Sequence, residues 1–273
     1  MAPSPNSHYL CNMKLTFLGT GTSQGVPVIG CRCNVCRSAD RRDRRLRTSA
    51  AVECGGKRMV IDAGPDFRYQ MLRAGITSID ALLLTHEHKD HIGGIDDVRA
   101  FNFADYPHAI RTVDIYAARH TADVVLKDYD YAFGEARYRG VPEIELHVID
   151  EQQPFTAAGI GIVPVAGCHS DRFRVTGYRI GPLAYLTDFR DIAPAEISKI
   201  EGVDTLVVNA LRHREHPSHF NIAQALELIE RVRPRAAYLT HMSHEAGLHE
   251  DLARTLPAGV MPAYDTLEIE IND

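Results

Sequence analysis

The chain has 273 residues, of which 45% are hydrophobic and 24% are charged, and its formal net charge is −6 at pH 7. These values are typical of a soluble globular protein with a sizeable core, and nothing in the global charge indicates a nucleic-acid or anionic-membrane partner. No window approaches the ~18 apolar residues of a membrane-spanning helix. The start of the chain, MAPSPNSHYLCN, lacks the charged and apolar regions of a secretory signal. We therefore expect a cytoplasmic protein without membrane contact, in which residues 1–12 form a flexible extension.

The first feature along the chain is a cysteine cluster in GCRCNVCRSADRRDRR, residues 30–45. Three thiols lie on a six-residue span, and a tetrahedral structural zinc needs four ligands. The candidate ligands in this stretch are Cys31, Cys33 and Cys36. Cys11 and Cys54 are available thiols elsewhere, although Cys54 is also explained as a small apolar residue before a Gly-Gly hairpin turn. The fourth ligand is left open by these residues alone.

A run of arginines follows the cysteines. It comprises Arg37, Arg41, Arg42, Arg44, Arg45 and Arg47. Two interpretations remain open: a solvated face with interspersed aspartates, or an electropositive rim for an anionic substrate.

The segment IDALLLTHEHKDHIGGIDD, residues 79–97, is the most informative part of the chain. Its apolar run at 81–84 predicts a short strand buried on both faces. The strand is followed directly by side chains of the types that bind metals, and two glycines then allow the chain to turn. The ligand-type residues are His86, His88, Asp90 and His91. Four such residues in six positions at a strand end predict a metal site.

Four further strands are predicted to end in an imidazole or a carboxylate. KRMVIDAGPD ends at Asp62, GIGIVPVAGCHS at His169, GPLAYLTDFRD at Asp188, and RPRAAYLTHMSH at His241. If these strands lie in packed sheets, their ends can converge on one edge. Asp62 is either a buried carboxylate that orients a ligand histidine or a turn-forming residue before Gly64 and Pro65.

These side chains suffice for two metal ions. We expect His86, His88 and His169 to hold one ion, Asp90, His91 and His241 to hold the other, and Asp188 to lie between them. Two ions bridged by a carboxylate and a hydroxide form a clamp for in-line attack on a phosphoryl or acyl centre. Histidine and carboxylate ligands suit zinc, and also manganese and iron.

The motif THEHKDH is similar to the H-x-H-x-D-H signature of the metallo-β-lactamase superfamily, and the later order of histidine, aspartate and histidine resembles that superfamily's order of ligands. The resemblance covers the chain from Met13 onward. It implies an α/β fold, the four-layered αββα sandwich, formed by a single hydrolase domain over residues 13–273. It is specific for the fold and the metal site and much less so for the substrate.

LGTGTSQGVPVIGCRCNVC, followed much later by THMSH, resembles one branch of the superfamily, the phosphoribosyl cyclic phosphate phosphodiesterases (PhnP-like) of the carbon–phosphorus lyase pathway. The resemblance implies a structural zinc on the three cysteines and His244, a homodimer, and a small, cyclic or nucleotide-like phosphodiester substrate. It implies a catalytic role for Asp90 among the metal ligands. A relative in pyrroloquinoline quinone biosynthesis carries a similar cysteine loop.

A loop with three histidines precedes a predicted helix at 221–232, for which Asn221 is placed as the cap. His219 resembles the histidine that this branch uses as a general acid or phosphate ligand, and the unperturbed histidine pKa of ~6.5 suits proton donation at neutral pH. The alternative is a surface histidine in a polar loop, which is our interpretation of His213 and His216. Asn209, where some relatives carry an acidic residue, leaves the orientation of His219 open.

The segment between the metal motif and His169 is predicted to contain a strand at 112–118 and a helix at 119–133. Tyr129, Tyr131 and Phe133 near its end either stack on a substrate ribose or base or pack over the pocket mouth, and we favour packing. The chain has no Trp and no long basic arm for tRNA, so a small molecule is the expected substrate rather than a nucleic acid. The rivals of a phosphodiesterase are a lactonase-like acyl hydrolase, a cofactor-biosynthesis protein, and a non-catalytic binding module with gaps in its ligand set.

Overall fold

The computed structural model describes residues 12–134 and 140–271. The predicted extension, apart from Asn12, and the rival ligand Cys11 lie outside these residues. Within them the chain forms two mixed sheets of seven strands each.

The first sheet has the strand order β14-β1-β2-β3-β4-β5-β6. The bounds are β1 (Met13–Gly19), β2 (Ser49–Cys54), β3 (Lys57–Ile61), β4 (Ala81–Leu83), β5 (Val113–Ala118), β6 (Ile144–Ile149) and β14 (Glu268–Ile271). The second sheet has the order β13-β12-β11-β10-β9-β8-β7. Its bounds are β7 (Phe155–Ala157), β8 (Ile160–Cys168), β9 (Arg174–Ile180), β10 (Leu183–Leu186), β11 (Thr205–Asn209), β12 (Ala236–Thr240) and β13 (Val260–Pro262).

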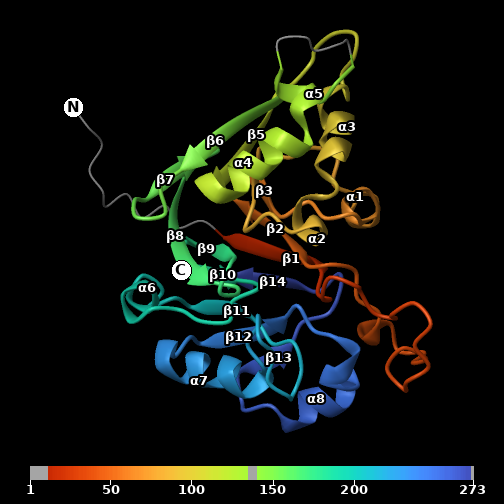
Figure 1. The fold of residues 1–273 in the computed structure, drawn as a ribbon, viewed down its shortest axis with the longest axis vertical. Coiled ribbons are helices and arrows are strands. Elements are labelled where there is room, and N and C mark those ends of the chain that lie inside the picture. The colour runs from red at the N-terminus through yellow and green to blue at the C-terminus, as the bar shows by residue number, and fades with distance from the viewer. Residues whose placement is uncertain (1–11, 135–139, 272–273) are drawn as a thin grey trace.

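Helices cover the outer face of each sheet (Figure 1). On the first sheet lie α1 (Phe67–Ala74), α2 (Lys89–Ile92), the 3-10 turn η2 (Ile95–Val98), α3 (Arg99–Asn102), α4 (Arg119–Asp128) and α5 (Asp130–Phe133). On the second lie α6 (Pro194–Ser198), α7 (Ile222–Val232), the 3-10 turn η3 (His244–Ala246) and α8 (His249–Thr255). A further turn, η1 (Arg41–Asp43), lies in the long loop after β1. The predicted αββα sandwich is confirmed.

Three apolar clusters hold these layers together. The cluster between the sheets includes the fully buried Phe17, Tyr178 and Tyr185. A second cluster packs the second sheet against α6, α7 and α8, and a third packs the first sheet against α1 and α4. Burial of large apolar side chains on both faces of each sheet contributes most of the stabilisation.

Strand direction brings the site-bearing ends to one edge. Strands β3 to β6 run parallel, and so do β10 to β13. Since β9 is antiparallel to both β8 and β10, β8 also ends at the edge where β10 ends. The carboxyl ends of parallel strands are where loops of α/β folds carry their sites.

The predicted helix at 221–232 is confirmed as α7, and Asn221 caps it. Its side chain accepts from the backbone N–H of Gln224, whose own side chain accepts from the N–H of Asn221 in return. The predicted helix at 119–133 divides into α4 and α5 at Tyr129. The hydroxyl of Tyr129 donates to the carbonyl of Ile92 over 2.6 Å, which ties this break to α2. Tyr129 therefore packs against the layer of helices.

Candidate metal centre

Three of the strand-end residues have backbone angles that L-residues rarely adopt. Asp62 follows β3 with φ 63°, Asp188 follows β10 with φ 64°, and His241 follows β12 with φ 53°. The left-handed region is disfavoured for residues with a Cβ, although aspartate and histidine enter it more readily than most. Non-glycine residues held there cluster at functional sites, because the surrounding fold must compensate for the strain. In each case the turn directs a side chain into the same edge of the sandwich.

The loop after β4 supplies the largest group of side chains. His88 precedes α2, and Asp90 and His91 lie within it. Gly64, in the turn after Asp62, lies against the backbone of this helix, and a Cβ there would come within 1.9 Å of the carbonyl oxygen of Asp90. Glycine is therefore required where the two loops touch. This close contact fixes the position of α2 relative to the turn after β3.

The structure brings every predicted catalytic-metal ligand together. Groups whose nitrogen and oxygen atoms all lie within 4.8 Å of one another are His86, His88 and His169; Asp90, His91 and His241; His86, His91 and Asp188; and His169, Asp188 and His219. The first two groups are the two ligand sets expected from the sequence. The other two share Asp188.

Asp188 lies where the two groups meet, because it shares one cluster with His86 and His91 and another with His169 and His219. Its Oδ1 lies 3.0 Å from Nε2 of His241 and 3.1 Å from Nε2 of His219. Its Oδ2 lies 3.3 Å from Nε2 of His91 and accepts a 2.6 Å hydrogen bond from the hydroxyl of Thr187. A carboxylate with both oxygens engaged in this way is arranged to bridge two ions.

Hydrogen bonds to the far side of the imidazoles set their orientation. Nδ1 of His91 lies 2.7 Å from Oδ2 of the fully buried Asp62, and Nδ1 of His169 lies 2.8 Å from the carbonyl oxygen of Asp188. Each acceptor favours a proton on Nδ1 and leaves the lone pair of Nε2 free for a metal. The geometry supports the orienting interpretation of Asp62, and the same residue also turns the chain.

The imidazole atoms that face the centre lack hydrogen-bond partners. Among the described residues, Nε2 of His86 and Nδ1 of His241 are buried without a partner, and Nε2 of His91 and of His241 lie near carboxylate oxygens without forming a hydrogen bond of regular geometry. A buried polar atom left in this state is costly, and coordination of a metal removes that cost. The donor set of imidazole nitrogens and carboxylate oxygens therefore fits divalent metals, with zinc and manganese both suited.

The same crowding shifts the pKa values of the site. Burial disfavours the charged form of His91, but the carboxylates of Asp188, Asp90 and Asp62 outweigh it and raise the pKa of His91 well above its usual value. Burial, with the charge of His91 next, lowers the pKa of His86 well below its usual value. A metal that binds here must displace the proton of His91, so metal affinity falls as the pH falls.

The cysteine loop and His244 form a second cluster. Cys31, Cys33, Cys36 and His244 meet in one group, with Nδ1 of His244 3.2 Å from Sγ of Cys31 and 3.4 Å from Sγ of Cys33. A backbone N–H of Cys36 contributes most to lowering the pKa of Cys33 to about 6. Three thiols and one imidazole match a structural zinc site.

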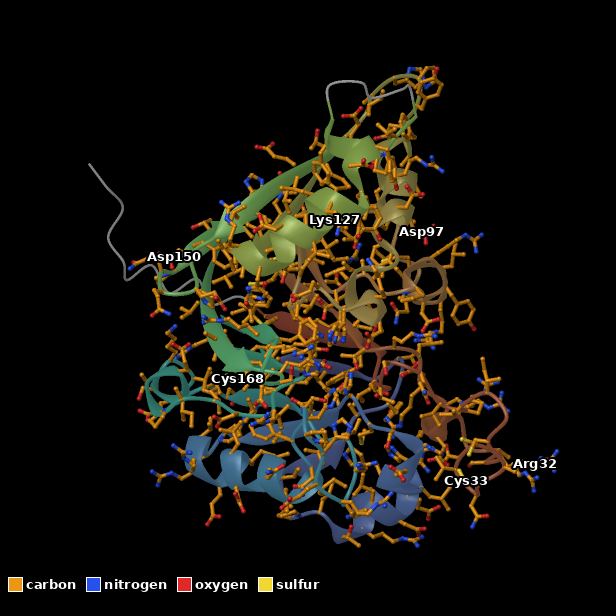
Figure 2. All side chains as sticks on the ribbon, in the orientation of Figure 1. Arg32, Cys33, Asp97, Lys127, Asp150 and Cys168 are labelled. Carbon is orange, nitrogen blue, oxygen red and sulfur yellow. The ribbon has the colours of Figure 1, made fainter. Side chains whose placement is uncertain are left out.

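The other described cysteines lie elsewhere. Figure 2 shows Cys33 on the protruding loop at the right of the view, well apart from Cys168. Cys168 is exposed at the end of β8. Cys54 ends β2 at the edge away from the metal centre and packs against the core between the sheets. This supports its interpretation as a small apolar residue before the β2–β3 hairpin.

His219 lies beside the centre and is held from both sides. Its Nε2 faces Asp188, its ring stacks on His241 with centroids 4.8 Å apart, and its Nδ1 lies 2.9 Å from Nδ1 of His216. Burial is the main cause of its lowered pKa. His213 is exposed, as expected. His216 is half-buried against His219, which differs from its predicted place on the surface, because the turn at Pro217 and Ser218 folds the loop back on itself.

Asn209 and Thr187 are structural partners of the site that the sequence analysis did not assign. Oδ1 of Asn209 accepts from the N–H of Phe189 over 2.8 Å, and its Nδ2 donates to the carbonyl of Phe189 over 2.9 Å. Asn209 therefore fixes the turn that carries Asp188, while His219 is oriented by other contacts. The sequence signal that could have identified both residues is their position as polar residues at the ends of parallel strands.

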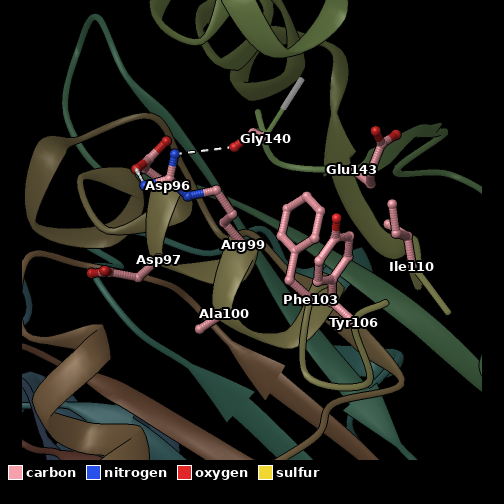
Figure 3. Close-up of a pocket in the computed structure, with 9 residues that line it drawn as sticks. All are labelled: Asp96, Asp97, Arg99, Ala100, Phe103, Tyr106, Ile110, Gly140 and Glu143. Carbon is pink, nitrogen blue, oxygen red and sulfur yellow. Dashed lines mark hydrogen bonds and ion pairs between the residues drawn. The ribbon is translucent and has the colours of Figure 1, made fainter. Parts of the chain in front are cut away.

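A cavity of about 1010 Å³ lies away from this centre, beside η2 and α3 (Figure 3). Phe103 and Tyr106 form an apolar side, and Asp96, Asp97 and Glu143 contribute carboxylates. The described residues that line it include no histidine or cysteine. Its size alone therefore does not make it the catalytic site.

The arginine run divides between structural and free side chains. Arg45 is buried, Arg47 pairs with Asp66 over 3.1 Å, and Arg42 pairs with Asp40 over 2.7 Å. Arg41 and Arg44 are exposed. Neither of the two interpretations offered for the sequence describes the whole run, because part of it holds the fold.

The fold and the two clusters define a metal-dependent hydrolase of the metallo-β-lactamase type. Comparison with known proteins agrees: the model of the beta-lactamase superfamily domain matches residues 57–242. The chain belongs to the metallo-β-lactamase superfamily, in its PhnP-like branch. Residues 12–134 and 140–271 contain no helix long and apolar enough to cross a membrane.

Three known proteins show which members of the superfamily this chain is similar to. The crystal structure of a diphosphatase of the PhnP family superposes with a TM-score of 0.87 at 40% identity, covering 95% of this chain and 98% of that one. A Porphyromonas gingivalis protein named octanoyltransferase is 42% identical over 263 residues, which are 96% of this chain and 52% of that protein. Zinc-bound PqqB from Methylobacterium extorquens shares the fold, with a TM-score of 0.74 at 18% identity over 94% of this chain and 100% of that one. The chain spans about half the length of the first curated relatives it matches.

Proposed function

We propose that this protein is a phosphodiesterase that hydrolyses small, cyclic or nucleotide-like phosphodiesters at a centre of two divalent metals. The observation that carries the proposal is the position of His219, whose Nε2 lies 3.1 Å from Oδ1 of Asp188 at the edge of a complete ligand set. A complete set argues against a non-catalytic module, which would be expected to have lost ligands.

Two divalent ions in this site, zinc or manganese, would make water nucleophilic at neutral pH and neutralise charge on the non-bridging phosphate oxygens. His86, His88 and His169 would hold one ion, and Asp90, His91 and His241 the other, with Asp188 shared. A third ion, zinc, would be held by the three cysteines and His244. These assignments of number and metal are part of the proposal.

His219 supplies what a metal pair lacks, a proton for the leaving alkoxide. Nε2 points into the centre, and the solvent-accessible His216 contacts Nδ1 on the outer side. An imidazole is suited to donate a proton near neutral pH. The same N–H can alternatively bind a non-bridging phosphate oxygen, and both roles require the proton on Nε2.

The chemistry of the diphosphatase relative is compatible with this proposal. A disubstituted diphosphate and a phosphodiester both present a phosphorus atom with two bridging and two non-bridging oxygens. One metal pair and one proton donor can therefore serve either bond. A diphosphate ester is accordingly the second candidate substrate, favoured by the 40% identity to that structure.

The name octanoyltransferase is not carried over to this chain. The match covers 52% of that relative, so its remaining half has no counterpart here and can account for the acyl-transfer activity. We propose that the metal-centre half acts on phosphate esters in its own right. We further propose that the substrate is a small molecule and that the protein acts as a homodimer in the cytoplasm.

The test is a substrate panel on one metal-analysed preparation: bis(p-nitrophenyl) phosphate, p-nitrophenyl phosphate, a disubstituted diphosphate and a lactone. The proposal expects hydrolysis of the diester well above that of the monoester and the lactone. A metal-loaded protein that leaves the diester intact and opens the lactone would overturn it in favour of acyl hydrolysis.

A further inference from the structure

A second cavity, of about 840 Å³, lies between α1, the loop that carries η1 and the turn before β14. Figure 1 shows α1 and this red-orange loop on the same side of the molecule. The lining residues are Val26, Pro27, Ala39, Arg41, Arg44, Arg45, Leu46, Tyr69, Arg73, Asp265 and Thr266. The described lining thus contains four arginines and one carboxylate.

The carboxylate is already occupied. Oδ1 of Asp265 accepts from the backbone N–H and the hydroxyl of Thr20 over 3.0 and 2.8 Å. Its Oδ2 accepts from the N–H of Leu46 over 2.9 Å and from Nη1 of Arg73 over 3.2 Å. One negative charge of the lining therefore serves several donors, and the carboxylates of Asp43 and Asp40 add to it only from outside the lining.

Within the described part of the chain no carboxylate forms an ion pair with Arg45, although Asp265, Asp43 and Asp40 act on it at longer range. Its guanidinium is buried and donates to the hydroxyl of Thr20 over 2.8 Å and to the carbonyl of Ala263 over 2.6 Å, both neutral oxygens. Holding a buried cation without a contacting anion is costly. An anion in the cavity would relieve this cost, so Arg45 favours occupancy.

Arg41 and Arg44 are the free cations of the cavity. Both are exposed, and neither guanidinium has an ion-pair or hydrogen-bond partner among the residues that the structure describes. Their backbone is held nevertheless, because Asp40 caps η1 by accepting from the N–H of Arg42 over 2.8 Å. Two guanidiniums on a fixed turn are suited to bind the oxygens of a phosphate.

The cavity lies at the same edge of the sandwich as the metal centre. Since β1 runs parallel to β3, through the antiparallel β2, the residues after β1 and before β14 lie at the edge to which Asp62 belongs. Three inter-strand spacings separate β14 from β3, which corresponds to about 14 Å. The ion pair between Arg47 and Asp66 joins the segment that follows η1 to the turn that follows Asp62.

We propose that this cavity is a second anion-binding site, which takes the phosphate group of an organic phosphate between Arg41 and Arg44. The exposed ring of Tyr69 and the apolar Val26 and Pro27 are placed to contact the organic part. The anion is either a second phosphate of the substrate or the phosphate of a separate ligand. The site does not depend on which bond the metal centre breaks.

The experiment is calorimetric titration of the metal-loaded protein with medronate, a non-hydrolysable diphosphate analogue, at constant ionic strength. We expect wild type to show two sites, one at the metals and one in the cavity. In the double variant Arg41→Gln/Arg44→Gln the cavity site should weaken at least about tenfold, because two charge-assisted contacts are lost. The matched control is Arg231→Gln/Arg233→Gln, which removes the same charge from exposed arginines at the end of α7.

Identical isotherms for wild type and the cavity variant would overturn the proposal, and so would an equal loss in the control, since that would be a bulk charge effect.

The source of the anion is identified by measuring kcat for bis(p-nitrophenyl) phosphate at a saturating concentration of this substrate, where competition at the metals has no effect. A change in kcat on adding medronate identifies a separate ligand. An unchanged kcat, with cavity binding intact, identifies the substrate's own second phosphate, which this small diester lacks.

Discussion

Sγ of Cys31 lies 3.2 Å from Nδ1 of His244, although the two residues are 213 positions apart in the chain. His244 begins η3, three residues after His241 of the metal centre, so the cysteine loop is held next to the catalytic edge. Ser243 in turn donates to the carbonyl of Leu211, at the start of the loop that carries His219. The cysteine cluster and the proposed proton donor are thus connected through one short turn.

This connection makes the cysteine cluster testable by metal content. Cys36→Ser removes one thiol of the group, and we expect the loss of one metal per chain and a thermal midpoint lower by several degrees, because a structural zinc contributes folding free energy. Diester hydrolysis should fall with it, since the His219 loop loses its support. The control Cys168→Ser alters an exposed thiol outside this cluster and should keep all metals. An unchanged metal count in Cys36→Ser would contradict the zinc assignment.

Asp62→Asn tests the orientation of His91. Asparagine tolerates a φ of 63°, so the turn should survive. Both oxygens of Asp62 accept hydrogen bonds, from the N–H and hydroxyl of Thr85 over 2.8 Å each, and an amide cannot accept at both positions. We expect a 10- to 100-fold loss, roughly, in metal affinity or activity, measured by competition with a chelator.

The matched control for that variant is Asp114→Asn. Asp114 makes a similar contact with a histidine, 2.9 Å from Nε2 of His147, on the surface of the first sheet. It should leave metal affinity unchanged. Equal metal affinity in Asp62→Asn and wild type would mean that Asp62 serves the turn alone.

His219→Ala should lower kcat for diester hydrolysis by about 10²- to 10⁴-fold while both catalytic metals are retained. The reason is that the six side chains of the two ligand groups, together with Asp188, suffice to hold the ions. His213→Ala, a change at an exposed histidine of the same loop, should have no effect. Loss of metal together with activity would instead make His219 a ligand.

His249 predicts a specific acid sensitivity of folding. Burial, followed by the charges of Arg45 and Arg42, lowers its pKa from 6.5 to about 4. Between these values the unfolded chain binds a proton that the folded protein does not, so the free energy of unfolding falls as the pH falls through this window. Urea midpoints at pH 7 and pH 5 should therefore differ more for wild type than for His249→Gln. Equal differences would show that His249 is not responsible.

Much of the site could be predicted because its chemistry is local in the sequence. Apolar runs that end in histidine or aspartate mark buried strands with ligands at their ends, and the parallel strands β3, β10 and β12 then bring Asp62, Asp188 and His241 to one edge. The cap of α7 was equally local, because Asn221 and Gln224 are three residues apart.

What could not be predicted depends on contacts between distant segments. The left-handed backbone of Asp188 has no sequence signal, since such a φ is normally expected of glycine. The need for Gly64 arises from the carbonyl of Asp90. The arginine run could not be resolved either, because Arg45 is buried by Thr20 and Ala263, which lie 25 and 218 positions away.

The most direct test of the central claim is stepwise metal reconstitution. The chelated protein is titrated with zinc or manganese while bound metal and hydrolysis of bis(p-nitrophenyl) phosphate are followed in the same sample. The account predicts no hydrolysis without metal, and activity that appears only as the ligand groups around Asp188 fill, to about three metals per chain with the cysteine site included. Diester hydrolysis that persists in fully metal-free protein, or a three-metal protein inert to the diester, would contradict it.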